Sequence, residues 1–305
     1  MITKKNKRGQ CRNKQLLTIC SLLFSTALSA QTEAETAGMC TIEAGNVTMT
    51  VDPGAGGKIM SLRYGDAEVI SQSRWPESFG STFWTSPQKE WNWPPVPEID
   101  KRPYTVEQRE PSLVMTSQLS ERLGYRVRKE FTASEPSGAI VVTYSVINEG
   151  REPRSVAPWE ITRVPNEGLI FFDAPVDKIT PQGLMAFSGE HGAAWYQADQ
   201  APQNRKVNAD GKGWLAYANK GLLLVKQFPD LDASQPAPDE AEIQVYENRG
   251  KTYIELESQG AYTLLKPGES LSWTVRWFLV PFDGDAVASE ALLKQVQTLM
   301  GKSDI

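Results

Sequence analysis

A short segment of the sequence places two carboxylates, a phenol and an amide at alternating positions. Residues 252–259 read TYIELESQ, in which the polar side chains are those of Tyr253, Glu255, Glu257 and Gln259. Alternate residues of a β-strand share a face, so this row is either a solvated outer face or one wall of a site. In a site, such carboxylates could transfer protons, because burial or a like-charged neighbour raises their pKa towards the working pH.

Tryptophan is concentrated between residues 75 and 93, where four of the nine tryptophans of the chain occur: Trp75, Trp84, Trp91 and Trp93. Rigid aromatic rings offer large contact areas at low entropic cost, and the C–H faces of sugars stack on them. Gln88 lies among them and could hydrogen-bond sugar hydroxyls. The alternative is that these rings only cover one end of the fold.

The segment from residue 71 to about residue 111 is predicted as the longest irregular stretch of the chain. A loop of this length inside a compact domain is more often a binding loop than a spacer. Arg74 could orient hydroxyls or carboxylates with its forked donors, or serve as a salt-bridge partner.

Metal and cofactor chemistry finds little support in the sequence. His191 is the only histidine, and Cys40 is the only cysteine after residue 30, so no set of histidine and cysteine ligands can form. No nucleotide-binding loop and no Gly-x-Ser-x-Gly elbow is present. We therefore expect neither a metal nor a cofactor.

Short runs rich in β-branched and aromatic residues fill the chain from about residue 41 to residue 281. Gly, Pro, Asn and Asp separate them, which predicts many short strands in a large all-β sandwich. The exception is 285–300, where apolar residues recur at helical spacing and Gly301 follows as a cap. We expect a single β-sandwich domain over residues 41–301 with a short C-terminal helix.

The first 30 residues have the features of a secretory signal peptide. Six basic residues and no acidic ones precede a 15-residue apolar stretch that ends in small side chains. Cleavage is expected after Ser29 or Ala30. This stretch is shorter than the ~20 residues of a membrane span. An uncleaved N-terminal anchor is the alternative. Residues 31–40 are predicted as a flexible mature N-terminus, and the location as periplasmic or secreted.

Removal of that signal changes the charge of the chain. The net charge of −5 becomes about −11, since six basic residues leave and no acidic ones do. An acidic protein is a poor partner for nucleic acid or anionic lipid, so we expect no nucleic acid and no membrane contact after cleavage. The charge suits a neutral or cationic small ligand.

Three ordered segments carry a resemblance to aldose 1-epimerases, which are also called galactose mutarotases. They are the Gly-rich segment that begins at Gly56-Gly57, the Leu-Glu-x-Gln segment 256–259, and the Lys-Pro-Gly-Glu turn 266–269 before an aromatic strand. The sequence is still more similar to an uncharacterised bacterial family allied to these enzymes, in the segments 84–88 (WTSPQ), 157–160 (APWE) and 226–229 (KQFP). The resemblance covers about residues 41–281.

This resemblance implies a two-layer β-supersandwich of the galactose mutarotase-like type, which binds a carbohydrate in the groove of its concave sheet. Glu257 falls on the position of the catalytic base, which takes the proton of the anomeric hydroxyl. Epimerases protonate the ring oxygen with histidines, and this chain has Pro158-Trp159-Glu160 where an Asn-His strand is expected. Glu160 could replace the acid if burial beside Trp159 raised its pKa, and His191 is the other candidate.

Three functions therefore stay open. The first is an exported, epimerase-like enzyme with Glu257 as base and Glu160 or His191 as acid. The second is a sugar-binding protein without catalysis. The third is a glycoside hydrolase or lyase that uses Glu160 with Glu257 or a tyrosine such as Tyr253. In each case the partner is a small carbohydrate, and the expected substrate contacts are Trp84, Gln88, Trp91, Trp93, Trp159, Arg74, Glu255 and Gln259.

Overall fold

The computed structural model describes residues 38–301, except residues 76–77, 135–136, 200 and 251. The predicted signal peptide and most of the predicted N-terminal stretch lie outside the described residues. Cys40 already belongs to the first strand. No helix in the described part of the chain is long and apolar enough to cross a membrane.

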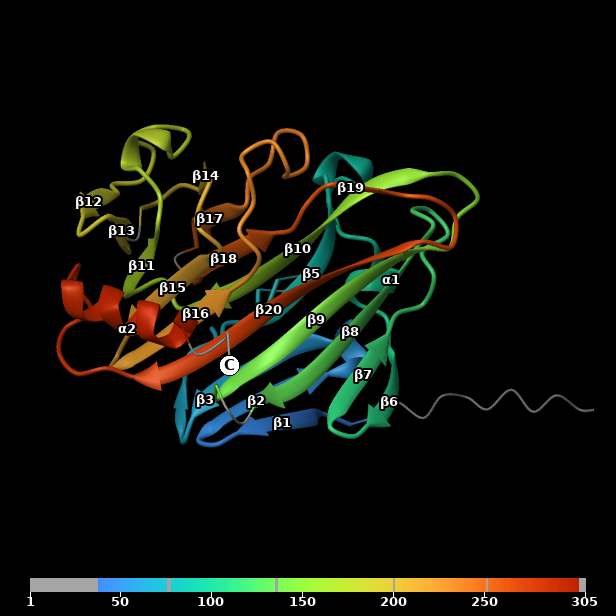
Figure 1. The fold of residues 1–305 in the computed structure, drawn as a ribbon, viewed down its shortest axis with the longest axis horizontal. Helices are drawn as coiled ribbons and strands as arrows, with labels where there is room; N and C mark the ends of the chain where they lie inside the picture. Colours follow the sequence, from blue (N-terminus) through green and yellow to red (C-terminus); the bar gives the residue numbers. More distant parts are fainter. Residues whose placement is uncertain (1–37, 76–77, 135–136, 200, 251, 302–305) are drawn as a thin grey trace, which may run out of the picture. The chain divides into compact units, whose positions relative to one another are not determined.

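The described residues form two antiparallel sheets of ten strands each (Figure 1). The first sheet has the order β1-β2-β3-β5-β10-β18-β17-β14, with β4 paired to β3 and β19 to β10. Its strands are β1 (Cys40–Ala44), β2 (Val47–Asp52), β3 (Lys58–Tyr64), β4 (Ala67–Glu68), β5 (Ser81–Ser86), β10 (Arg154–Val164), β14 (Arg205–Ala209), β17 (Ile243–Glu247), β18 (Ile254–Gln259) and β19 (Thr263–Leu265).

The second sheet has the order β12-β13-β11-β15-β16-β20-β9-β8-β7-β6. Its strands are β6 (Thr105–Arg109), β7 (Ser112–Thr116), β8 (Tyr125–Ser134), β9 (Ala139–Asn148), β11 (Leu169–Phe172), β12 (Ser188–Glu190), β13 (Ala193–Gln197), β15 (Trp214–Asn219), β16 (Leu222–Gln227) and β20 (Ser270–Pro281). The long strands β20, β9 and β8 lie side by side in Figure 1.

The two sheets pack face to face around one apolar core. Alternation along β8 buries Tyr125, Val127 and Phe131, as the period of two requires for a strand with one face in a core. Phe83 of β5 stacks on Tyr144 of β9 with ring centroids 4.6 Å apart, which joins the first sheet to the second. The predicted two-layer β-sandwich is confirmed.

The helices are short. α1 (Pro97–Asp100) packs near β5, and α2 (Glu290–Met300) is the predicted C-terminal helix. The Oγ atom of Ser289 accepts a hydrogen bond from the backbone N–H of Leu292 at 3.4 Å, so this cap fixes the start of α2 five residues after the position predicted from the sequence. α2 turns Leu292, Val296 and Leu299 into the core.

The stretch from residue 71 to residue 111 is more regular than predicted. It contains β5, α1 and β6, so the prediction of one long loop is wrong. β5 was missed because it is buried on both faces and its sequence, STFWTS, shows no alternation of polar and apolar residues. Trp84 therefore lies on a central strand of the first sheet.

The pairing of β10 with β18 decides which side chains can meet. Trp159 lies opposite Gln259, and Ile161 opposite Glu257, so these residues share one face of the first sheet. Glu160 lies opposite Ser258 and therefore points to the other face, towards the second sheet.

Candidate functional site

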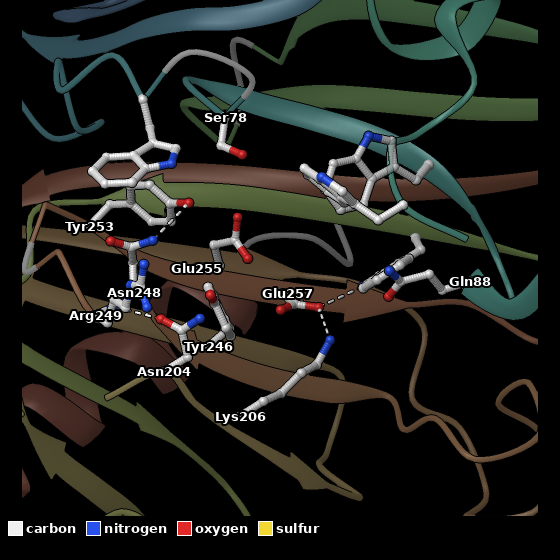
Figure 2. Close-up of a pocket in the computed structure, with 14 residues that line it drawn as sticks. Ser78, Gln88, Asn204, Lys206, Tyr246, Asn248, Arg249, Tyr253, Glu255 and Glu257 are labelled. Carbon is white, nitrogen blue, oxygen red and sulfur yellow. Dashed lines mark hydrogen bonds and ion pairs between the residues drawn. The ribbon is translucent and has the colours of Figure 1, made fainter. Parts of the chain in front are cut away.

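A cavity of about 640 Å³ opens on the outer face of the first sheet, the face that points away from the second sheet (Figure 2). This volume is in the range of sites for small organic ligands. Its aromatic lining residues are Trp75, Trp84, Trp93, Trp159, Tyr246 and Tyr253, and its charged ones are Lys206, Arg249, Glu255 and Glu257. Ser78, Gln88, Asn204 and Asn248 complete the lining.

Neighbouring strands build the floor of the cavity. Lys206 of β14 lies opposite Tyr246 of β17, and Tyr246 lies opposite Glu255 of β18. Glu257 lies two residues further along β18, on the same face. Antiparallel register therefore brings these side chains together from three adjacent strands, although about 40 residues separate β14 from β17 in the chain.

Glu257 is the buried acid of the cavity, with 1% of its surface exposed. Its Oε2 atom accepts a hydrogen bond from Trp159 Nε1 at 2.9 Å and another from Lys206 Nζ at 2.9 Å. Burial raises the pKa of this carboxyl to about 7; Lys206 counteracts the rise, whereas the negative charge of Glu255 adds to it. A carboxyl with this pKa gains and loses a proton near neutral pH, which is the property of a general base.

Glu255 differs from Glu257 in its partner. It forms an ion pair with Arg163, with Nη2 and Oε1 2.8 Å apart. The guanidinium of Arg163 lies between two rings, 5.7 Å from the centroid of Trp84 and 5.5 Å from that of Tyr253. Burial by itself would lower the pKa of Arg163, but the nearby Glu255, Tyr253 and Asp100 raise it above its ordinary value. The pair therefore holds a fixed cation and a fixed carboxylate beside Glu257.

Tryptophans form one wall of the cavity. The Trp84 ring meets Trp159 edge-to-face with centroids 5.4 Å apart, and it meets Trp93 in the same way at 5.9 Å. Trp93 is 54% exposed, so part of its ring faces solvent. Lys206 Nζ lies 4.7 Å from the centroid of Trp159, a cation–π contact that adds to its hydrogen bond with Glu257.

The opposite end of the cavity carries Trp75, which is 43% exposed, together with Asn204, Asn248 and Arg249. Asn204 Oδ1 accepts a hydrogen bond from the backbone N–H of Arg249 at 2.7 Å, which ties the strand ends together. A Cβ atom at Gly250 would lie 3.1 Å from the Trp75 ring, so glycine lets the ring approach the backbone closely.

Five of the predicted substrate contacts and the predicted base line the cavity together. They are Trp84, Gln88, Trp93, Trp159, Glu255 and, as base, Glu257, with Tyr253 beside them. Trp91 does not line it: its ring is buried, and its Nε1 atom donates to the Thr85 carbonyl at 2.8 Å.

Arg74 and Gln259 are also absent from the cavity wall. Arg74 is exposed and stacks over Phe79 at 4.9 Å. Gln259 is fully buried; its Nε2 donates to Ser86 Oγ at 3.0 Å and to Glu240 Oε2 at 2.6 Å. Gln259 therefore anchors the segment that contains Glu240 rather than facing the cavity.

Glu160 is not among the residues that line the cavity, so its position does not support its predicted role as the acid. It is fully buried between the sheets, where it forms an ion pair with Lys226 of β16. Ser81 Oγ and Thr162 Oγ1 also donate to its Oε1 atom. The alternation of side chains along β10 explains why Glu160 is not in the cavity: Trp159 faces the cavity, so the next residue must face the core.

His191 is equally remote from Glu257. It lies between β12 and β13 and contacts Glu290 of α2, with Nδ1 and Oε1 3.7 Å apart. It lines a different hollow together with Trp214 and residues of α2. The predicted role of His191 as the acid is not supported by this position.

Lys206, Tyr246, Asn204, Asn248 and Arg249 were not singled out from the sequence. Their segments carry no distinctive motif, and only the long-range pairing of β14, β17 and β18 brings them to the cavity. Among the described residues, no group of three or more His, Cys, Asp or Glu side chains is arranged to hold a metal ion.

Comparisons with known proteins identify the fold. No protein-family model and no curated protein matches the sequence. Among solved structures, a candidate aldose 1-epimerase from Escherichia coli is similar over 80% of this chain and 99% of its own, with 13% identity and a TM-score of 0.54. A candidate aldose 1-epimerase from Klebsiella pneumoniae is similar over 84% and 80%, with 14% identity and a TM-score of 0.54.

A galactose mutarotase-like protein from Lactobacillus casei is similar over 80% of this chain and 100% of its own, with 13% identity and a TM-score of 0.52. At these identities the likeness shows the fold. The chain therefore has the galactose mutarotase-like fold predicted from its sequence.

Proposed function

We propose that this protein binds a small carbohydrate in the cavity and interconverts its anomers, as an aldose 1-epimerase does, with Glu257 as the base. The observation that carries the proposal is the state of Glu257: a carboxyl with a pKa of about 7, buried in a tryptophan-lined cavity. It occupies the position at which the sequence resemblance puts the epimerase base. The solved structures with this fold support the same class of substrate.

The lining of the cavity suits a sugar. The exposed rings of Trp75 and Trp93 offer flat apolar surfaces for C–H faces. Gln88, Asn204 and Asn248 offer amide donors and acceptors for hydroxyls. Neutral polar groups beside aromatic rings are what an uncharged, hydroxyl-rich ligand requires.

The proposed reaction opens and recloses the sugar ring. Glu257 takes the proton of the anomeric hydroxyl, the C1–O1 bond becomes a carbonyl, and the bond from C1 to the ring oxygen breaks. The ring oxygen must receive a proton in the same step. Rotation about C1–C2 and the reverse proton transfers then give the other anomer.

A sugar-binding protein without catalysis is the second candidate. The observation that favours it is the position of Glu160 and His191, the two predicted acids, both of which lie outside the cavity. The export of the protein, by way of the predicted signal in residues 1–30, belongs to both candidates and would place it where incoming sugars are met.

The experiment compares wild type with Glu257→Gln. Anomer exchange of D-glucose and D-galactose is followed by NMR, and sugar binding is followed by tryptophan fluorescence. We expect Glu257→Gln to lower the exchange rate about 100-fold or more, since general base catalysis contributes ~10²–10⁴-fold. Binding should persist, because glutamine keeps an oxygen for Trp159 and Lys206.

The matched control is Glu43→Gln, an exposed carboxylate on β1 outside the cavity. Equal exchange rates for wild type and Glu257→Gln would contradict the role of Glu257. Fluorescence quenching without any acceleration by wild type would favour the binding protein. If the sugars cause no quenching and the protein gives no acceleration, the carbohydrate proposal itself is overturned.

A further inference from the structure

We infer that Lys206 is the acid that protonates the ring oxygen, in place of the histidine that this cavity does not contain. This inference rests on the proposed epimerase reaction and names the group that the reaction still needs. It starts from the contact in Figure 2, where Lys206 reaches from β14 to Glu257 and its Nζ atom lies 2.9 Å from Oε2.

The geometry of the reaction requires an acid close to the base. The anomeric oxygen and the ring oxygen are both bonded to C1, so the groups that exchange protons with them must lie side by side. General acid–base catalysis also requires each group within hydrogen-bond reach of its target. Lys206 Nζ and Glu257 Oε2 meet this requirement, because they lie 2.9 Å apart.

Both groups have capacity left for a substrate. An ammonium has three N–H donors, and Lys206 uses one of them on Glu257. The hydrogen bonds that Glu257 accepts from Trp159 and Lys206 both end on Oε2. Oε1 is therefore the oxygen for the anomeric hydroxyl, while a second N–H of Lys206 points to the ring oxygen.

The step balances without any further reactant. The anomeric O–H proton moves to Glu257, the oxygen lone pair forms the carbonyl, and the electrons of the bond from C1 move to the ring oxygen. That oxygen takes a proton from Lys206, which leaves a neutral amine and a neutral carboxyl. Ring closure on the other face of the carbonyl returns both protons and restores the ion pair.

The other polar groups of the cavity are weaker candidates for the acid. Burial raises the pKa of Tyr246 to about 12 and also raises that of Tyr253, which makes both phenols weaker acids. Glu255 already forms an ion pair with Arg163. Arg249 carries a guanidinium, and arginine is a poor proton donor.

The environment of Lys206 also suits proton exchange. Its side chain is 36% exposed, whereas that of Glu257 is 1% exposed, so Lys206 is the member of the pair that can exchange protons with water. The charged and titratable groups that face it are Glu257 from β18 and Tyr246 from β17, and the Trp159 ring from β10 supports the ammonium.

The experiment uses Lys206→Arg and Lys206→Met, with Lys294→Met on the exposed side of α2 as the control. Anomer exchange of D-galactose and D-glucose is measured from pH 6 to 9.5. Arginine keeps the positive charge beside Glu257 but is a poor proton donor. We expect both Lys206 variants to lose about 100-fold or more in kcat at every pH, with little change in KM.

A purely electrostatic role would give a different result. Lys206→Arg would then stay active, and Lys206→Met would recover once the pH exceeded the raised pKa of Glu257. Either outcome overturns the inference while leaving Glu257 as base. Melting temperatures and tryptophan quenching show whether each variant is folded and binds sugar. A wild type that is inactive on both sugars would instead contradict the proposed function.

Discussion

Glu160 of β10 and Glu257 of β18 lie on neighbouring strands of one sheet, yet their side chains leave it from opposite faces. Glu160 lies opposite Ser258, whereas Glu257 lies opposite Ile161. The sheet itself therefore separates the two carboxyls. Paired carboxyls of a glycoside hydrolase must flank the same bond, so this arrangement does not support the predicted pair of Glu160 with Glu257.

The first prediction concerns the buried ion pair of Glu160 with Lys226, both of which are fully buried between the sheets. Lys226→Met leaves the carboxylate of Glu160 unpaired, and we expect a loss of about 3–5 kcal/mol in the free energy of unfolding. The double variant Glu160→Leu/Lys226→Met should recover most of this loss, because Ser81 and Thr162 can bond to each other at 3.0 Å. Urea unfolding measures both.

A double variant that is as unstable as Lys226→Met would contradict this account. It would mean that the loss comes from packing of the lysine stem rather than from an uncompensated charge. Anomer exchange by the folded double variant should equal that of wild type, since the pair lies on the far side of the sheet from the cavity.

The sequence correctly predicted the faces of side chains within one strand, where residues alternate with a period of two. Alternation in 252–259 correctly placed Tyr253, Glu255 and Glu257 on one face, because a strand fixes the directions of its own side chains. The same rule excludes Glu160 once Trp159 is known to face the cavity. The sequence alone did not reveal which of these two adjacent residues faces the cavity.

Lys206 shows what the sequence could not supply. Its local segment, RKVNA, resembles an ordinary strand in which one charged side chain faces outwards. Its position beside Glu257 depends on the pairing of β14 with β17, which joins segments about 40 residues apart. Register between distant strands is decided by the packing of the whole sheet, and no local motif encodes it.

The second prediction is the pH dependence of anomer exchange. Glu257 must be ionised to take a proton, and burial raises its pKa to about 7. We therefore expect kcat/KM to rise with pH from about 5, with its midpoint near 7, and then to reach a plateau. A surface carboxylate with an ordinary pKa would give a plateau already near pH 5.

The rate is measured after subtraction of the uncatalysed exchange in the same buffers. A profile that is flat between pH 5 and pH 8 would show that no group of this pKa controls the reaction. Lys206→Met should move the rising limb to higher pH in any residual activity, because Lys206 lowers the pKa of Glu257.

The third prediction concerns Lys129 of β8, a buried lysine outside the cavity. Its Nζ atom donates to the carbonyls of Gly56 and Gly57 at 2.8 and 3.0 Å. Burial, and to a lesser degree the nearby charge of Lys58, lowers its pKa to about 7, although Asp100 and Glu160 oppose the change. In the unfolded chain the pKa returns to its ordinary value of about 10.5.

Between pH 7 and pH 10.5 the unfolded chain therefore binds a proton at this lysine that the folded protein does not bind. Stability rises with pH wherever the unfolded state binds more protons, so Lys129 makes the free energy of unfolding increase across this window by about 1 kcal/mol per pH unit. Lys129→Met should remove this increase. The difference between the two unfolding free energies, measured in urea at pH 6.5 and pH 9, should thus widen in favour of wild type by about 2–3 kcal/mol. A constant difference would mean that Lys129 stays protonated in the folded protein, held as an ammonium by the two glycine carbonyls.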